Sequence, residues 1–103
     1  MIKAMIVDDK TAAIELLRWI IKEKCPDISS VVSAISVNEA LPLIDNFKPD
    51  LVFLDIQMPG KTGFELLQEL DKVPTVIFTT AHDEYALKAF QVNALDYLLK
   101  PIE

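Results

Sequence analysis

Short apolar runs and helically spaced apolar positions follow one another in turn along the chain. The apolar runs suit β-strands and lie at 2–7, 28–35, 51–54, 75–79 and 96–99. The stretches between them suit helices and lie at 11–24, 36–47, 63–70 and 83–91. In the first of these, the positions at i, i+3, i+4 and i+7 are Ala13, Leu16, Leu17 and Ile20. Strands that alternate with helices predict an α/β domain built on a parallel sheet.

The stretch 36–47 contains a conflict between two local signals. Ser36 and Glu39 form an S-x-x-E capping box, which marks the start of a helix. Pro42 lies further along, and a proline inside a helix costs ~3 kcal/mol because it removes a hydrogen bond and clashes with the preceding turn. We therefore expect this helix either to kink or to start late.

The composition limits the classes of protein to which the chain can belong. Its 103 residues suffice for one domain with a core, and a hydrophobic content of 51% argues against disorder. The net charge of -6 argues against direct binding of nucleic acid. No apolar run approaches the roughly 20 residues of a membrane span, and the start lacks a signal-peptide pattern. We therefore expect a cytoplasmic protein without membrane contact. Cys25 is the single cysteine, so no disulfide framework is expected.

Chemically useful side chains stand at the points where four of the expected strands end. The carboxyl ends of parallel strands meet at one edge of a sheet, where functional groups collect. The first strand ends in two carboxylates, the third in one, the fourth in hydroxyls and the fifth in an ammonium group. These residues are Asp8, Asp9, Asp55, Thr79, Thr80 and Lys100. We expect them to converge on the same edge.

Such a set of groups suits the transfer of a phosphoryl group. Three neighbouring carboxylates repel one another, and a hard divalent cation relieves that repulsion. Mg²⁺ prefers oxygen ligands and keeps positions for water or for a phosphoryl oxygen. Lys100 could neutralise a second phosphoryl oxygen, and the hydroxyl of Thr80 could bond a third. The carboxylate left to react would be a nucleophile, as in enzymes that form an aspartyl phosphate.

Each of these residues also has an ordinary explanation when it is taken alone. Asp8 and Asp9 could cap the first helix, and Asp55 could be a solvated strand end. Thr80 could be a turn residue and Lys100 a surface residue. Their joint placement at one edge favours the shared site.

Four motifs cover the chain from one end to the other. They are V-D-D at 7–9, L-D-I-Q-M-P-G at 54–60, T-T-A at 79–81 and D-Y-L-L-K-P at 96–101. In this order they resemble the receiver domains of two-component response regulators. The stretch F-T-T-A-H-D-E-Y-A-L-K-A-F at 78–90 is most similar to receivers that precede a LytTR-type DNA-binding domain. The resemblance implies a doubly wound, flavodoxin-like sheet of five parallel strands in the order 2-1-3-4-5.

The resemblance implies that Asp55 is the phosphoacceptor and that a sensor histidine kinase supplies the phosphoryl group. It also implies a Mg²⁺ site next to Asp55. Asp9 and Asp55 would bind the ion directly, Asp8 largely through water, and Gln57 through its backbone carbonyl. These four residues are the expected metal ligands.

The resemblance assigns further residues to switching and to phosphoryl lifetime. Thr80 would be the switch hydroxyl, Tyr97 the switch aromatic, and Lys100 the lysine that contacts the phosphoryl group. Gln57 and His82 occupy the positions that tune self-hydrolysis in the family, two residues after the phosphoacceptor and two after the switch threonine.

Lys10 departs from the family pattern, because an acid is common at that position. It puts a cation beside Asp8 and Asp9 and could weaken the affinity for Mg²⁺. It could equally point into solvent.

The family's domain normally has a fifth helix after the K-P turn, whereas this chain stops at Glu103. The resemblance therefore implies a receiver domain over 1–103 that lacks its last helix. Without that helix, an apolar face of the first helix should be partly uncovered and should drive self-association, as in a homodimer. The residues of that face are Ala13, Ile14, Leu17 and Ile21.

The leading interpretation is a signalling phosphoacceptor that assists its own phosphorylation and dephosphorylation and is not otherwise an enzyme. Phosphorylation would draw Thr80 toward the site and let Tyr97 move inward, and a DNA-binding output domain outside this chain would respond. The alternative is an interaction module that keeps the fold without the chemistry. A flavodoxin-like cofactor binder would need a glycine after the first strand, where D-D-K-T-A has none. A haloacid-dehalogenase-type phosphatase would need D-x-D there.

Overall fold

A parallel five-stranded sheet forms the centre of the described part of the chain. The computed structural model describes residues 2–70, 72–80 and 96–99. The strands are β1 (Ile2–Val7), β2 (Ile28–Ala34), β3 (Leu51–Asp55), β4 (Thr75–Thr80) and β5 (Asp96–Leu99). Their order in the sheet is β2-β1-β3-β4-β5, and every neighbouring pair is parallel. The fold class and strand order expected from the sequence are confirmed.

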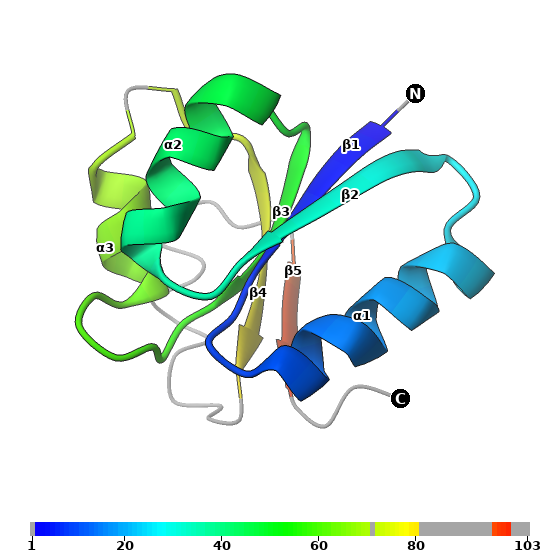
Figure 1. Cartoon of the computed structure of the whole chain (residues 1–103), viewed down its shortest axis with the longest axis horizontal. Helices are drawn as coiled ribbons and strands as arrows, with labels where there is room; N and C mark the ends of the chain where they lie inside the picture. The colour runs from blue at the N-terminus through cyan, green and yellow to red at the C-terminus, as the bar shows by residue number, and fades with distance from the viewer. Residues whose placement is uncertain (1, 71, 81–95, 100–103) are drawn as a thin grey trace.

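Three described helices cover the two faces of this sheet. They are α1 (Thr11–Lys24), α2 (Val37–Phe47) and α3 (Gly63–Gln68). Figure 1 shows α1 on one face and α2 with α3 on the other. The expected helix at 83–91 and the chain after Leu99 lie outside the described residues. Among the described helices none has both the length and the apolar character that a membrane crossing requires.

The all-apolar run of β3 is explained by its position between β1 and β4, with helices on both sides. Val52 and Leu54 belong to the core cluster under α2 and α3, whereas Phe53 belongs to the cluster under α1. Side chains alternate between the two faces of a strand, so a strand covered on both sides needs apolar residues at every position. The run therefore ends on Asp55 because the strand ends there, at the edge of the sheet.

The apolar face of α1 that was expected to be partly uncovered is mostly buried. Ile14, Leu17 and Ile21 are buried, with exposed fractions of 6%, 5% and 3%, and they pack on the sheet with Ala4, Ile6 and Phe53. The expectation that these three residues are uncovered is wrong. Ala13 is half-buried, as expected. Because the expected self-association rested on that uncovered face, its structural basis is removed.

The large apolar residues that remain exposed on α1 are Leu16 and Trp19, at 43% and 58%. Leu16 belonged to the spacing that predicted the helix, yet it belongs to neither core cluster. More than half of the circumference of α1 is apolar, so periodicity predicts the helix without selecting which stripe faces the sheet.

Helix α2 starts where its capping signal places it and contains Pro42 in its interior. The Ser36 hydroxyl accepts a hydrogen bond from the Glu39 N–H at 3.1 Å, and the Glu39 carboxylate accepts one from the Ile35 N–H at 3.4 Å. Of the two expected outcomes, the late start is wrong, and the kink stays a prediction. Pro42 has no N–H, so the Asn38 carbonyl lacks the hydrogen-bond donor that it would have in a regular helix. Both residues are exposed, and water can therefore donate to that carbonyl instead.

Candidate metal centre

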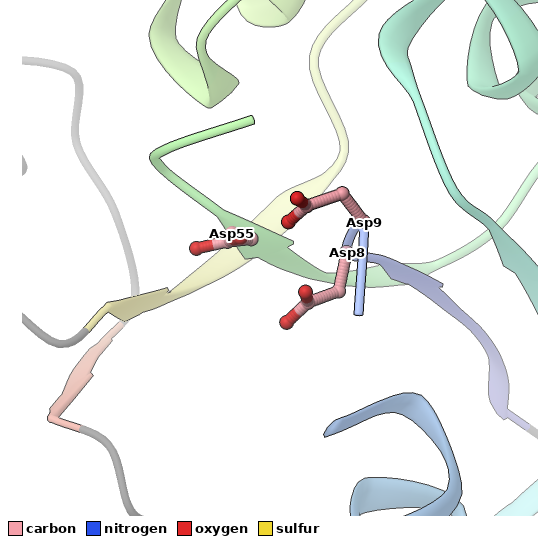
Figure 2. A group of neighbouring side chains, drawn as sticks. All are labelled: Asp8, Asp9 and Asp55. Atoms are coloured by element: carbon pink, nitrogen blue, oxygen red, sulfur yellow. The ribbon is translucent and has the colours of Figure 1, made fainter. Parts of the chain in front are cut away.

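Three carboxylates meet where β1 and β3 end. Val7 and Leu54 are partners in the β1–β3 ladder. The residues that follow them, Asp8 and Asp55, therefore lie next to each other at the carboxyl edge of the sheet. Asp8 is 3% exposed and Asp55 is 2% exposed, whereas the Asp9 side chain is half-buried. One carboxylate oxygen from each of the three lies within 4.8 Å of the other two (Figure 2).

The end of β1 is held by main-chain and side-chain hydrogen bonds. The Asp8 N–H donates to the carbonyl of Ala34 on β2 at 3.1 Å, and the Asp8 carboxylate accepts from the Lys10 N–H at 2.9 Å. The second bond spans two residues and shapes the turn between β1 and α1. It is not the N-cap bond of α1, because Lys10 is itself the N-cap residue and precedes the helix. The turn keeps the Asp8 carboxylate at the sheet edge.

The loop after β3 is fixed at both of its ends. The Ile56 N–H donates to the carbonyl of Thr79 on β4 at 3.2 Å, and the Ile56 carbonyl accepts from the Gly63 N–H at 2.8 Å. The loop that carries Gln57 is thus closed by the first residue of α3. This closure stabilises the backbone immediately after Asp55.

A second capping box, which was not among the features expected from the sequence, holds the end of that loop. The Thr62 hydroxyl accepts from the Glu65 N–H at 3.2 Å, and the Glu65 carboxylate accepts from the Thr62 N–H at 2.9 Å. The signal was available as T-x-x-E at 62–65, which marks a helix start.

The backbone register places β4 beside Asp55 and β5 on the other side of β4. Thr79 is the ladder partner of Asp55 and is 2% exposed, and Thr80, the last residue of β4, pairs with Leu99. Tyr97 pairs with Phe78. The side chains of Thr80 and Tyr97 are not among the described parts, and His82 and Lys100 lie outside the described residues.

The donor set of this site fits a hard divalent cation. The ligand atoms that the described residues bring together are all carboxylate oxygens, and two of the three carboxylates are buried. Oxygen-only sets of this kind suit Mg²⁺, whereas Zn²⁺ sites are usually built from nitrogen and sulfur donors. A cation here would also offset the repulsion among the three negative charges. Asp8, Asp9 and Asp55 can therefore hold Mg²⁺.

Lys10 places a positive charge on one of these ligands. Its ammonium nitrogen lies 3.5 Å from an Oδ1 oxygen of Asp9, and its own side chain is 67% exposed. The ammonium group must give up this contact, or share it, when a cation binds Asp9. Solvent screens such an exposed pair, so the competition is weak.

Replacement of Lys10 by Met should tighten the binding of Mg²⁺ by about two- to fivefold, because an exposed ion pair contributes at most ~1 kcal/mol. The dissociation constant can be measured by titration calorimetry at low ionic strength, where screening is smallest. Lys22→Met, an exposed lysine of α1 away from the carboxylates, is the matched control. Equal affinities in wild type and Lys10→Met would show that the Lys10 ammonium does not compete with the metal.

A protein-family model and several curated proteins match the sequence of this chain. The family model described as the response regulator receiver domain matches residues 4–103. The sensory transduction protein LytT of Enterococcus faecalis is 49% identical over 102 residues, which are 96% of this chain and 42% of that protein. The transcriptional regulatory protein BtsR of Salmonella typhi is 47% identical over 105 residues, covering 100% of this chain and 44% of that protein. The chain thus spans less than half the length of these relatives.

A solved structure of a complex has the same fold as this chain. The crystal structure of the response regulator protein TrrA from Thermotoga maritima, in complex with Mg(2+)-BeF, has a TM-score of 0.83 against this chain. The two are 30% identical, and the match covers 100% of this chain and 90% of TrrA.

Proposed function

Since this chain belongs to the response regulator receiver domains, we propose that Asp55 accepts a phosphoryl group from a sensor histidine kinase. Phosphorylation-based switching in two-component signalling is the general role of this family. The observation that carries the assignment to Asp55 is the convergence of Asp8, Asp9 and Asp55, whose carboxylate oxygens lie within 4.8 Å of one another. Of the three, Asp55 alone is itself the last residue of a strand, the middle strand β3, and is followed by a loop closed at both ends.

The reaction is an in-line displacement at phosphorus. A carboxylate oxygen of Asp55 attacks the phosphorus of a phosphohistidine, the new O–P bond forms, the P–N bond breaks, and the leaving imidazole takes up a proton. The 2% exposure of Asp55 limits the access of water to the nucleophile. Asp8, Asp9, Asp55 and the Gln57 carbonyl would hold Mg²⁺, which would neutralise charge on the phosphoryl oxygens.

Further residues complete the proposed site from β4 and from the chain after β5. Thr80 follows the ladder partner of Asp55, and Lys100 follows Leu99, which pairs with Thr80. This register supports a role of the Thr80 hydroxyl and the Lys100 ammonium in binding the phosphoryl group. Tyr97 is proposed as the switch aromatic, and Gln57 and His82 as the residues that tune hydrolysis of the acyl phosphate.

The output of the switch is proposed to be transcriptional. The relatives named above include a sensory transduction protein and a transcriptional regulatory protein, and each is more than twice as long as the matched region. We infer a DNA-binding output domain in the full-length protein and a cytoplasmic location, which is typical of response regulators. An interaction module without phosphorylation is the alternative that the experiment below separates.

The test is the intact mass of the protein after incubation with acetyl phosphate, with and without Mg²⁺. The expected result is a mass gain of one phosphoryl group that requires Mg²⁺, with fragmentation placing the group on Asp55. Chelation of the metal should abolish the adduct, because the carboxylates then repel the incoming phosphate. No adduct at saturating Mg²⁺ would favour the interaction module, and an adduct on another residue would refute the assignment of Asp55.

A further inference from the structure

Both glycines of this chain follow Asp55 closely, one in the loop after β3 and one at the start of α3. They are Gly60 and Gly63, and the sequence has no others. Gly60 has a φ of +86°, a conformation that residues with a side chain rarely adopt, and a Cβ atom there would meet nothing within 4 Å. Gly63 is the first residue of α3. A glycine is needed there because the neighbouring atoms leave no room for a side chain. The two glycines are thus required for separate reasons.

Gly63 packs directly against the main chain of Asp55. A Cβ atom built on Gly63 would lie 2.5 Å from the carbonyl oxygen of Asp55 and 3.0 Å from Cγ of Leu54. The first distance is shorter than any van der Waals contact, and its partner is backbone in a central strand. A backbone oxygen cannot rotate away as a side chain can, so either β3 or α3 would have to move.

Neither element can move without loss of other contacts. β3 is paired with β1 on one side and β4 on the other, and Leu54 at its end is fully buried. On α3, Phe64, Leu66 and Leu67 are buried in the core, and the Thr62–Glu65 capping box holds the helix start. A shift of either element would displace the loop that joins them. That loop is exposed at Gln57 and Gly60, so its backbone can change direction there.

We propose that Gly63 is a positioning residue for the metal site. By allowing α3 to begin against the Asp55 carbonyl, it closes the loop through the Gly63 N–H to Ile56 carbonyl bond of 2.8 Å and sets the direction in which the chain leaves Asp55. This inference rests on the proposed function, since it concerns the Mg²⁺ affinity of that same site. Gly63 itself touches neither the ion nor the phosphoryl group.

The test compares Gly63→Ala with Gly60→Ala. Gly63→Ala should weaken Mg²⁺ binding by about 10–100-fold, the range seen when residues that orient metal ligands are changed. Gly60→Ala should lose thermal stability, because alanine disfavours positive φ, and keep the wild-type dissociation constant. Calorimetry well below the unfolding temperature separates affinity from stability. Equal Mg²⁺ affinity in wild type and Gly63→Ala, or equal losses in both variants, would overturn the proposal.

A second measurement needs no variant and therefore does not depend on the folding of Gly63→Ala. Selective labelling with ¹⁵N-glycine gives one amide signal for each of the two glycines. Titration of the wild type with Mg²⁺ should shift the Gly63 signal with the dissociation constant found by calorimetry. A Gly63 signal that stays in place at saturating Mg²⁺ would overturn the proposal. If wild type neither binds Mg²⁺ nor forms the acetyl phosphate adduct, the proposed function fails instead.

Discussion

Replacement of Asp55 by Asn should abolish the phosphoryl adduct and, without Mg²⁺, raise the free energy of unfolding by about 1 kcal/mol. The amide cannot form an acyl phosphate, so the loss of phosphorylation should be complete. The gain in stability follows from the three carboxylates, whose oxygens lie within 4.8 Å of one another and repel in the folded state. Asparagine has nearly the same shape and removes one of the three charges.

Urea unfolding with and without Mg²⁺ measures this effect. Mg²⁺ should stabilise the wild type, because it binds the folded site, and should stabilise Asp55→Asn far less. Asp45→Asn is the matched control, since Asp45 is exposed on α2 and away from the cluster. A lower stability of Asp55→Asn in the absence of metal would show that attractive contacts of the carboxylate outweigh the repulsion.

Replacement of Phe78 by Ala should lower the free energy of unfolding by about 3–5 kcal/mol. Phe78 on β4 has an exposed fraction of 0%, and its ring lies 4.9 Å from that of Phe64 on α3, tilted by 57°. The substitution removes this ring contact and leaves a cavity between the sheet and α3. A loss of this size is a large share of the ~5–15 kcal/mol that stabilises a small domain.

The Phe78→Ala substitution should also disturb the backbone next to Asp55, because β4 contacts that backbone. The Thr79 carbonyl, next to Phe78, holds the Ile56 N–H after Asp55. Chemical unfolding gives the stability, and Phe78→Leu, which keeps most of the apolar volume, should lose roughly 1 kcal/mol. A similar small loss in Phe78→Ala would mean that the neighbouring side chains collapse into the space.

The amino-acid sequence determined the architecture because its signals are local and repeated. Alternation of strand and helix patterns predicted the parallel α/β sheet, and the fully apolar run before Asp55 predicted a central strand. The position of the carboxylates at strand ends also follows from the sequence, since residues just past parallel strands share one edge. These predictions depend on the spacing of neighbours along the chain, which tertiary contacts do not alter.

Tertiary structure alone decided which residues meet. Helical periodicity fits Leu16 as well as Ile14, and only the packing of α1 on the sheet buries Ile14 and leaves Leu16 exposed. The requirement for Gly63 arises from its distance to the Asp55 carbonyl, which no local pattern contains. The contact between Lys10 and Asp9 depends likewise on how the turn after β1 folds. Such features come from the approach of elements distant along the chain or from the direction of single side chains, and periodicity carries information about neither.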